Sequence, residues 1–493
     1  MNETVPAEVQ MICRRIGAAG GRPTLVGGAV IDMLQGRVAK DWDLEVFKMS
    51  FADMEDIFSD LRVDLVGKRF GVMKVSVGDV DIDINVPRRD NNFGVAHTDI
   101  MVDVDPSMTP KEAARRRDFT INAMSVDMIT GVVEDHFGGM HDLESGVLRV
   151  TDPALFVQDP LRALRGMQLL ARKAKTVDPA TMMLIRSMKD MFSALPKERV
   201  FTEFEKLMEK APKPSVGLSF LRDSGWIEHF PELMALIGCE QRAEWHPEGD
   251  VWTHSLLASD AAAEIRHLIP EHQRVGFMFG ATLHDVGKPE FTVTQEQIDC
   301  RDPIVMERAK AAGRSIESML LTAHGHDVGG EAPAEAFMRR LTNNNKLIKL
   351  VKGIVGLHMQ PWSLFSGNAR KGGFARLHRK AQEIGGDLAL MGRMCQCDSC
   401  ATGTDRSLAS GEPNWDHASS ARLFDFVSEF EADTSATVPK VQGRDLIAAG
   451  MKPGKIFGRI LADALDLQEA DDTLSKEEIM TAVCSIACIE DLA

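Results

Sequence analysis

A predicted strand, a double-glycine turn and a predicted helix follow one another near the N-terminus of this chain. Thr24–Val26 indicate the end of the strand, Gly27 and Gly28 form the turn, and Ala29–Leu34 begin the helix. The N–H groups at the start of such a helix have no partner within it, so they favour a bound anion. The sequence therefore predicts a phosphate-binding turn within an α/β unit.

Two aspartates follow this turn and lie two positions apart. Asp41 and Asp43 stand on either side of Trp42 in a second predicted strand, and residues i and i+2 of a strand point to the same face. Two carboxylates held that close are costly without a cation, and Mg²⁺ prefers oxygen ligands near phosphate. The pair predicts metal-assisted phosphoryl or nucleotidyl transfer. Taken alone, an Asp-rich turn in solvent is the alternative.

A third carboxylate is available from the alternating segment Asp81–Val86. Asp81 and Asp83 share one face of this predicted strand, so either one could complete a metal site, and we select Asp83. A strand at the edge of a sheet with a solvated face is the alternative interpretation.

Three consecutive arginines, Arg115–Arg117, precede Asp118 and Asn122. We expect the arginines at the start of a helix, where guanidinium groups suit the oxygens of a triphosphate. Asp118 and Asn122 are four positions apart, so they are expected to share a helical face and to hold a ribose.

Strand-like and helical segments alternate over residues 22–150, whereas helical patterns predominate after about Asp152. We expect strands at Thr24–Val26, Trp42–Phe47, Val72–Val77, Asp81–Val86 and Ser125–Met128. A chain of 493 residues is long enough for several domains. We predict an α/β head over residues 1–150, a helical neck over 151–240, a His-rich helical domain over 241–410 and a helical tail of unknown role over 411–493.

The composition sets broad limits on function. Hydrophobic residues make up 44% and charged residues 26% of the chain, values typical of a soluble globular protein. No secretory signal or membrane-length apolar run is visible, and eight cysteines in a chain this long fit a reducing compartment, so we expect a cytoplasmic protein. A net charge of −16 argues against a general nucleic-acid coat protein but permits a local basic groove.

Together, Gly27-Gly28, Asp41-x-Asp43 and the segment Arg116–Ala123 resemble the head of bacterial-type (class II) tRNA nucleotidyltransferases, the CCA-adding enzymes, and of their relatives the bacterial poly(A) polymerases. The resemblance implies an α+β fold with a polymerase-β-like α/β head, followed by an all-α neck and an all-α HD domain. It also implies Mg²⁺ at Asp41 and Asp43 and triphosphate contacts from Arg116 and Arg117. The implied partners are tRNA, CTP and ATP, with neither DNA nor a membrane.

The segment Gln158–Arg165 extends this resemblance. In the family, the Asp and Arg of a helical Glu-Asp-x-x-Arg motif read the incoming base, which assigns these roles to Asp159 and Arg162, with Arg165 also in the nucleotide site. A carboxylate accepts from the exocyclic amine of C or A, and a guanidinium donates to the neighbouring ring nitrogen. Gln158 replaces the usual Glu, so we expect weaker control of C versus A. A surface ion pair is the alternative for Asp159 and Arg162.

A second constellation consists of His254, the pair His284-Asp285 and a late aspartate, for which we select Asp398 ahead of Asp387. This order resembles the HD phosphohydrolase superfamily, and it implies a divalent transition metal such as Ni, Mn or Co, or Mg²⁺, on these four residues. His324, His326 and His358 are further imidazoles that could complete a second metal site or bind the leaving phosphate. In CCA-adding enzymes that carry an HD domain, this domain hydrolyses phosphomonoesters and 2′,3′-cyclic phosphodiesters.

The function predicted from the sequence is therefore template-independent addition or repair of the tRNA 3′-terminal CCA, together with a second, phosphohydrolase activity. A poly(A) polymerase, or an enzyme that adds only CC or only A, shares the same motifs and remains open. An HD phosphohydrolase with an RNA-binding head is a further alternative, against which the intact Asp41 and Asp43 argue.

Overall fold

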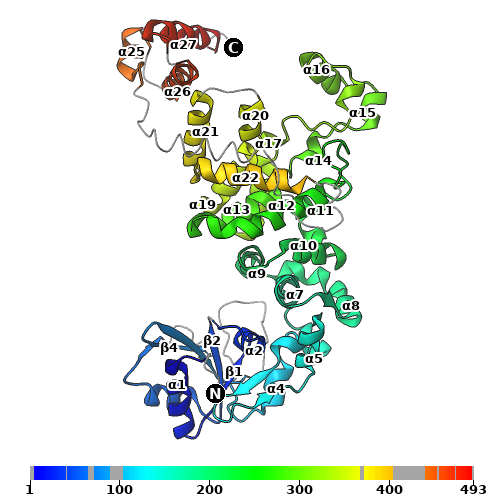
Figure 1. The fold of residues 1–493 in the computed structure, drawn as a ribbon, viewed down its shortest axis with the longest axis vertical. Helices are drawn as coiled ribbons and strands as arrows, with labels where there is room; N and C mark the ends of the chain where they lie inside the picture. Colours follow the sequence, from blue (N-terminus) through cyan, green and yellow to red (C-terminus); the bar gives the residue numbers. More distant parts are fainter. Residues whose placement is uncertain are drawn as a thin grey trace. The chain divides into compact units, whose positions relative to one another are not determined.

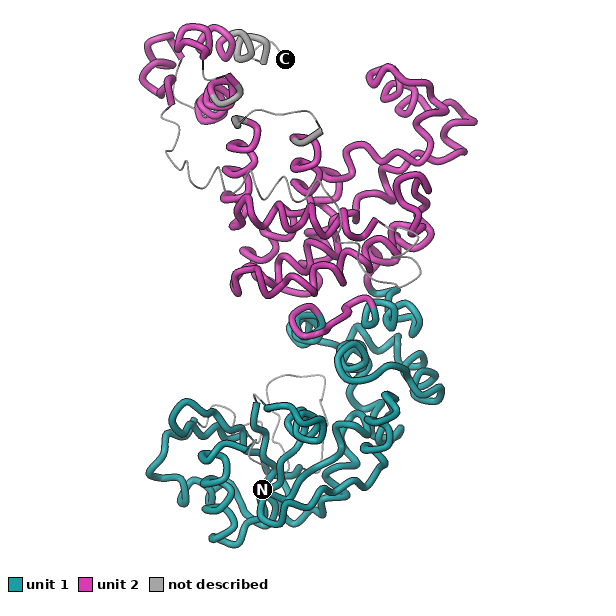
Figure 2. Tube along the Cα trace, viewed as in Figure 1, with its two compact units in different colours: residues 1–207, 216–229 teal, residues 208–215, 230–493 magenta. Residues whose placement is uncertain are grey.

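The computed structural model describes residues 5–39, 41–64, 72–88, 104–366, 371–402, 439–451, 455–471 and 473–490. The chain separates into two compact units, shown in Figure 2. Unit 1 comprises residues 1–207 and 216–229, and unit 2 comprises residues 208–215 and 230–493. The division into four domains stays a prediction. Residues 403–438, which include the end of the predicted 241–410 domain and the start of the predicted tail, lie outside the described residues.

A seven-stranded sheet forms the centre of the first part of unit 1 (Figure 1). Its strands, in spatial order, are β3 (Arg62–Asp64), β4 (Val72–Val77), β5 (Val80–Asn85), β2 (Trp42–Phe47), β1 (Arg22–Val26), β6 (Ser125–Asp127) and β7 (Val133–Glu134). The β2–β5 pair is parallel, and the other pairs are antiparallel. The expected strands are thus confirmed, β2 and β4 with the predicted bounds and the others to within two residues.

Alternation of side chains explains how the sheet presents its acidic residues. In β2, Trp42, Leu44 and Val46 are buried, which leaves Asp43 and Glu45 on the opposite, partly exposed face. Helix α1 (Ala7–Ala18), whose apolar side chains Val9, Ile12 and Ile16 are fully buried, packs on the sheet at β1 and β5, and α3 (Phe51–Ile57) packs against α1. The acidic side of β2 is therefore fixed by the apolar pattern of the same strand.

Short helices and a 3₁₀ turn connect or follow the strands along the chain. These are α2 (Gly28–Leu34), α4 (Pro110–Arg115), the 3₁₀ turn η2 (Thr120–Asn122) and α5 (Gly139–Ser145). The helix predicted after the glycine turn is confirmed as α2. The three arginines do not begin a helix, because α4 begins at the Thr109 capping box and Arg115 is its last residue. That part of the sequence prediction is wrong.

The remainder of unit 1 and its junction with unit 2 are helical apart from two short parallel strands, β8 (Val147–Leu148) and β9 (Thr176–Val177). The helices are α6 (Pro153–Phe156), α7 (Leu161–Lys173), α8 (Pro179–Ser187), η3 (Lys189–Ala194), α9 (Lys197–Lys210), α10 (Pro214–Asp223), η4 (Trp226–His229) and α11 (Pro231–Met234). Trp226 is fully buried and its indole N–H donates to the carbonyl of Ile185 at 2.9 Å, which ties η4 to the end of α8.

The main body of unit 2 is a bundle of helices. Its members are α12 (Val251–Ile265), η5 (Arg266–Leu268), α13 (Glu271–Leu283), α14 (Lys288–Phe291), α15 (Gln295–Asp299), α16 (Pro303–Ala311), η6 (Glu317–Met319), α17 (His326–Gly329), α18 (Glu331–Leu341), α19 (Asn345–Leu357), α20 (Gln360–Ser366), α21 (Lys371–Ile384) and α22 (Leu388–Ala401). Helices α13 and α19 approach closely because Gly276 and Gly280 have no side chain. A Cβ on Gly280 would lie 2.6 Å from a methyl carbon of Ile354.

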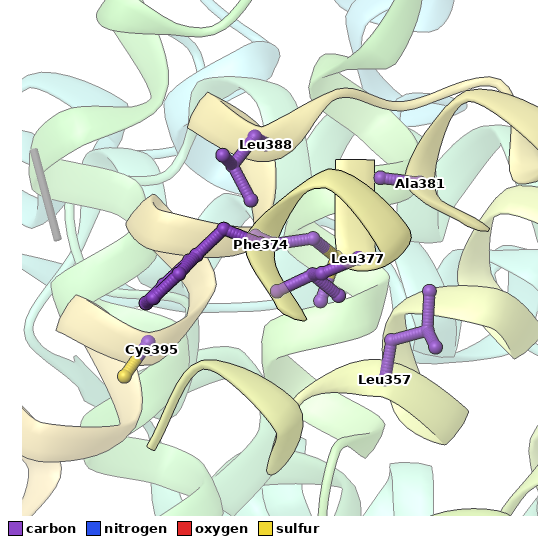
Figure 3. Packing of buried hydrophobic residues seen from close by; sticks show 7 residues of the cluster. Leu357, Phe374, Leu377, Ala381, Leu388 and Cys395 are labelled. Atoms are coloured by element: carbon purple, nitrogen blue, oxygen red, sulfur yellow. The ribbon is translucent and has the colours of Figure 1, made fainter. Parts of the chain in front are cut away.

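Figure 3 shows a hydrophobic cluster that joins α19, α21 and α22. Phe374 and Leu377 of α21 pack with Leu357 of α19 and Leu388 of α22. Burial of these side chains holds α22 in place. Asp398, the predicted late ligand, therefore stands on a helix that the core fixes.

The described part of the tail forms three helices, α25 (Gly443–Ala448), α26 (Lys455–Ala470) and α27 (Lys476–Glu490). They share a small core that includes Leu446, Ile460 and Ile479. Asp466 of α26 forms ion pairs with Arg376 and Arg379 of α21. None of the helices in the described ranges is long and apolar enough to cross a membrane.

Candidate functional site

The turn after β1 brings the backbone close to the first acidic group. Gly27 has a φ of 72°, which residues with a Cβ rarely adopt, and it precedes α2 directly. A Cβ at this position would lie 3.4 Å from Asp43 Oδ2 and 4.0 Å from Arg117 Nη1. The turn, a carboxylate and a guanidinium thus meet at one place in unit 1.

The parallel pairing of β2 with β5 supplies the third carboxylate. Asp43 is the register partner of Asp83, so both side chains belong to the same face of the sheet. Asp81 instead forms an ion pair with Lys74 at 2.8 Å and accepts from the hydroxyl of Ser76. Of the two candidates in β5, Asp83 is therefore the one adjacent to Asp43.

The surroundings of Asp43 disfavour the charged form of its carboxylate. Burial raises the pKa of this carboxyl, the positive charge of Arg117 opposes the rise, and the negative charges of Asp83 and Asp41 add to it. Arg117 also lies 3.5 Å from Glu45. Asp41 itself is exposed. Three carboxylates around one face, with burial raising the energy of the charged form, have the chemistry of a divalent-cation site.

Asp118 and Asn122 contact each other, but through a turn and not along a helix. Asn122 donates to Asp118 Oδ1 at 3.1 Å, the N–H of Phe119 donates to the same oxygen, and Arg165 Nε lies 2.8 Å from Asp118 Oδ2. Although burial opposes it, Arg165 and these two donors lower the pKa of Asp118. The shared helical face is thus wrong, since α4 and η2 lie on either side of Asp118.

The predicted base-reading pair is arranged differently from the prediction. Helix α7 begins at Leu161, so Asp159 precedes it, and Asp159 Oδ1 accepts from the N–H of Leu161 at 3.1 Å. Asp159 Oδ2 accepts from Arg199 of α9 at 2.8 Å. The two residues do not lie on one helix, and the pairing with Arg199 had no signal in the local sequence.

Arg162 is held by two backbone carbonyls. Its Nη1 donates to Leu155 at 2.8 Å and its Nη2 donates to Arg116 at 2.7 Å. Gln158, which replaces the usual Glu, is exposed. Arg162 is therefore oriented by the chain around it, and through Arg116 it is connected to the arginines at the end of α4.

The four predicted ligands of the HD constellation converge in unit 2. His254 Nε2 lies 3.2 Å from His284 Nε2, 3.0 Å from Asp398 Oδ1 and 3.7 Å from Asp285 Oδ2. These side chains come from α12, the end of α13 and α22. The predicted ligands thus meet, and Asp398 is the late aspartate at the cluster. Asp387 caps α22 by accepting from the N–H of Leu390.

A second set of ligands shares Asp285 with the first. Asp285 Oδ1 lies 3.1 Å from His326 Nε2 and 3.8 Å from His358 Nε2, and these two nitrogens are 3.2 Å apart. The sets His254–His284–Asp285 and Asp285–His326–His358 are both compact enough to hold a metal ion. Asp285 Oδ2 also contacts Lys288 Nζ at 2.7 Å. His324, the other candidate, is exposed.

Hydrogen bonds fix the tautomer of each histidine. Nδ1 of His284, His326 and His358 each contacts the carbonyl three residues earlier, at 2.9, 2.7 and 2.6 Å. A carbonyl only accepts, so Nδ1 carries the proton and Nε2 presents a lone pair to the cluster. Lone pairs 3.2 Å apart repel each other, and a cation between them removes that repulsion.

Glu248 has the same role for His254, and the local sequence gave no direct indication of it. Its Oε1 accepts from Nδ1 of His254 at 2.7 Å and from Nδ1 of His246 at 2.8 Å, with the carboxylate fully buried. A carboxylate that hydrogen-bonds a ligating imidazole is a frequent feature of metal sites.

Charges in the cluster are unevenly distributed. Burial lowers the pKa of His284, but Asp285 and Asp398 more than compensate and raise it to about 10. Burial, together with the neighbouring His284 and His326, lowers the pKa of His358 to about 4. The negative charge of Asp285 and Asp398 that raises the pKa of His284 would also attract a metal ion, which would take the place of the second proton on Nε2. In the second set, the lowered pKa of His358 keeps this imidazole neutral and available as a ligand.

Two stretches of the chain match known protein families. Residues 24–149 match the family model "Poly A polymerase head domain", and residues 176–237 match "Probable RNA and SrmB- binding site of polymerase A". The Multifunctional CCA protein of Xanthomonas campestris pv. campestris (strain B100) is 40% identical over 271 residues, which are 54% of this chain and 63% of that protein. The protein of the same name from Xylella fastidiosa (strain M23) is 36% identical over 272 residues, 54% and 62% of the two chains. The chain thus spans less than two thirds of the length of these relatives.

Solved structures share the fold at low sequence identity. The Bacillus stearothermophilus CCA-adding enzyme in complex with CTP is 18% identical, with a TM-score of 0.59 over 100% of this chain and 99% of that one. The Thermotoga maritima CCA-adding enzyme complexed with tRNA is 19% identical, with a TM-score of 0.51 over 98% and 97%. The mixed fold, a sheet followed by helices, is thus confirmed.

Proposed function

We propose that the protein adds or repairs the 3′-terminal CCA of tRNA from CTP and ATP, because residues 24–149 match the poly(A) polymerase head-domain model. One observation carries the proposal: Asp43 lies beside Asp83 in register and beside the Gly27 turn and Arg117. Curated relatives with 36–40% identity are named Multifunctional CCA proteins, which supports this substrate over others.

The carboxylates of Asp41, Asp43 and Asp83 fit divalent cations, because they offer only hard oxygen ligands. Mg²⁺ held there would lower the pKa of the primer 3′-hydroxyl and neutralise charge on the triphosphate and the leaving pyrophosphate. Gly27 and Gly28 would let the backbone approach the phosphates, and Arg116 and Arg117 would bind their oxygens.

For Asp118 and Asn122 the contacts of the structure favour a positioning role over the ribose contact expected from the sequence. Both oxygens of Asp118 already have partners in Phe119, Asn122 and Arg165, and Asp118 is only 4% exposed. We therefore assign Asp118 and Asn122 as positioning residues, which hold Arg165 toward the nucleotide site.

Asp159 and Arg162 would select the base. Each oxygen of Asp159 keeps a free lone pair beyond its bond to Leu161 or Arg199, and Arg162 keeps guanidinium protons beyond its two carbonyl bonds. C and A present an amine donor beside a ring-nitrogen acceptor, which matches this pair, whereas U and G present the opposite order.

Incorporation on defined tRNA ends tests the proposal. Purified protein is incubated with tRNA transcripts that end at the discriminator base and with each nucleoside triphosphate, alone and combined. Addition of C, C and A followed by arrest is expected. Long adenylate tails would instead identify a poly(A) polymerase, and addition of only CC or only A would identify a partial enzyme. No incorporation at all would leave an HD phosphohydrolase with an RNA-binding head.

A second activity is favoured by the cluster in unit 2. We propose that it hydrolyses phosphomonoesters and 2′,3′-cyclic phosphodiesters with two divalent ions that share Asp285. Buried Nε2 lone pairs and the carboxylates of Asp285 and Asp398 are suitable ligands for Ni, Mn or Co, and also accommodate Mg²⁺. Such ions would polarise the phosphate ester and lower the pKa of a water. Hydrolysis of 2′,3′-cyclic AMP by the wild type but not by His284→Ala tests this activity.

A further inference from the structure

A partly buried ion pair joins the helix after the glycine turn to the helix that carries Arg162. Lys173 Nζ lies 2.7 Å from Asp32 Oδ1, and the two residues are 141 positions apart in the chain. Asp32 belongs to α2, and Lys173 is the last residue of α7. Their side chains are 26% and 11% exposed. Helix α2 packs on β1 and η2, whereas α7 packs on β8, so the pair connects two helices that have different packing partners.

The α2 end of the pair is fixed to the phosphate-binding turn. Gly28, the first residue of α2, follows Gly27 directly, and Asp32 stands about one helical turn later. Ala29–Ile31 are buried, which holds this short helix against the strand before it. A displacement of Asp32 would therefore move the turn as well.

The α7 end of the pair is fixed to the base-reading residues. Arg162 is the second residue of α7. In the middle of this helix, Gln168 donates to Glu203 Oε2 of α9 at 3.2 Å, and the two residues are only 4% and 3% exposed. Glu203 stands four positions after Arg199, so one face of α9 contacts both Asp159 and Gln168. Helix α7 is thus held along its length, and a displacement at its last residue would reach its first turn.

Both charges of the pair are partly removed from water. Burial raises the pKa of Asp32, but Lys173 and Arg37 more than compensate and lower it. Burial lowers the pKa of Lys173, and Asp32 opposes this change only in part. Arg37 lies 3.0 Å from the same oxygen of Asp32, but it follows α2 in the chain and does not connect α2 with α7. Because removing charges from water costs free energy, a pair of this kind supplies a fixed geometry more than stability.

We propose that the ion pair between Lys173 and Asp32 fixes the distance between the base subsite and the triphosphate subsite of the nucleotide site. The proposal rests on the nucleotidyltransferase function given above, and it makes Asp32 and Lys173 positioning residues that contact neither the base nor the phosphates. CTP and ATP occupy both subsites at once, so their affinity depends on the spacing of the subsites, as for any ligand with two linked parts. A ligand that occupies one subsite does not depend on this spacing.

Binding to the full-length protein in the presence of Mg²⁺, measured by isothermal titration calorimetry, separates these two cases. The probes are CTP, which spans both subsites, and tripolyphosphate, which occupies only one. Lys173→Met should raise the Kd for CTP about tenfold, as expected for loss of a hydrogen bond between charged groups, and leave the Kd for tripolyphosphate unchanged. Lys173→Arg keeps the charge and should restore most of the CTP affinity. Lys189→Met is the matched control, because it removes a lysine whose ion pair with Glu228, also at 2.7 Å, lies elsewhere in unit 1, and it should change neither Kd.

A double-mutant cycle tests whether the two residues act as one unit. Asp32→Asn should weaken CTP binding about as much as Lys173→Met, and the double variant should bind CTP no more weakly than either single variant. Addition of single nucleotides to tRNA ends gives a second readout. Because a displaced α7 misplaces Arg162, use of UTP relative to CTP should rise about tenfold in each single variant.

Equal losses of CTP and tripolyphosphate affinity would overturn the proposal, because the pair would then support the phosphate-binding turn alone. An unchanged Kd for CTP in both single variants, or additive losses in the double variant, would overturn it as well. Asp32→Asn keeps the shape of the side chain and provides the same test if Lys173→Met does not fold. Failure of the wild type to bind CTP or to add nucleotides to tRNA would instead contradict the proposed function.

Discussion

Gly27 faces the carboxylate of Asp43 so closely that a Cβ at position 27 would lie 3.4 Å from Asp43 Oδ2. The relationship combines a left-handed backbone, with a φ of 72°, and a short approach to an acidic group whose pKa is raised. It connects the glycine turn with the aspartate pair, the two sequence motifs that first suggested nucleotidyl transfer. Each motif can be altered separately.

Gly27→Ala should lower kcat/KM for CTP addition by about a hundredfold or more. The left-handed conformation costs an L-residue about 1–2 kcal/mol, and a shift of the turn moves the backbone away from the phosphates, where a displacement of about 1 Å is enough for a hundredfold loss. Steady-state incorporation measures the effect. Gly36→Ala is the matched control, because Gly36 has a φ of 69° but nothing within 4 Å of an added Cβ. Equal losses in both variants would show that only backbone strain is involved.

Asp83→Asn and Asp81→Asn should differ strongly, although the residues lie two apart on one strand. Removing the charge of Asp83 takes a ligand from beside Asp43, so addition of nucleotides should fall about a hundredfold or more. Asp81 is exposed and paired with Lys74, so its substitution should change activity less than about twofold. Titration of activity against Mg²⁺ concentration checks the assignment, because only Asp83→Asn should need more metal. The same Mg²⁺ dependence in both variants would refute it.

Arg199→Ala should relax base selection more than it slows catalysis. Arg199 Nη2 donates to Asp159 Oδ2 at 2.8 Å. Without Arg199, the carboxylate loses one of the two hydrogen bonds that orient it. We expect misincorporation of UTP and GTP relative to CTP to rise about tenfold, with kcat for CTP changed less. Single-nucleotide incorporation kinetics measure both. Arg222→Ala, which removes an exposed ion pair with Asp223, should have neither effect. A fall in kcat without any change in selectivity would contradict the positioning role.

His326→Ala should remove one of two bound metal ions. The second ligand set contains Asp285, His326 and His358, and loss of one of its three ligands should leave only the first set occupied. Elemental analysis after dialysis is expected to give about two metal ions per wild-type chain and about one per variant chain. His324→Ala is the neighbouring control, since His324 is exposed and outside both sets. One ion in the wild type would rule out the second set.

Unit 2 should become less stable as rising pH removes the proton from the buried carboxyl of Asp260. Burial raises the pKa of this carboxyl to about 6, although Ser215 donates two hydrogen bonds to it, against an ordinary value of 3.8. The folded state therefore binds the proton of Asp260 more tightly than the unfolded state does. The stabilisation that this proton gives to the folded state is complete below pH about 4 and is lost between pH about 4 and 6. The difference amounts to about 3 kcal/mol. Thermal melts of Asp260→Asn and wild type should show the variant gaining relative stability from pH 4 to 7. A constant difference would exclude the shift.

The strands and the acidic motif could be predicted from the sequence because both depend on local periodicity. Apolar side chains at Trp42, Leu44 and Val46 place Asp43 on the opposite face whatever the sheet around them. The order His254, His284-Asp285, Asp398 was similarly visible, since the family resemblance rests on residue types and spacing. The predicted strands and the convergence of the four ligands agree with the structure for this reason.

The tertiary structure alone decided which polar groups have partners. Asp83 lies beside Asp43 because β5 pairs in parallel with β2, whereas Asp81 on the same strand is paired with Lys74. Arg165 forms an ion pair with the carboxylate of Asp118. Asp285 belongs to both ligand sets and so brings together histidines from separate helices. Strand register and helix packing are set by burial of residues far apart in the chain. A local pattern fixes the direction of a side chain but does not show what that side chain meets.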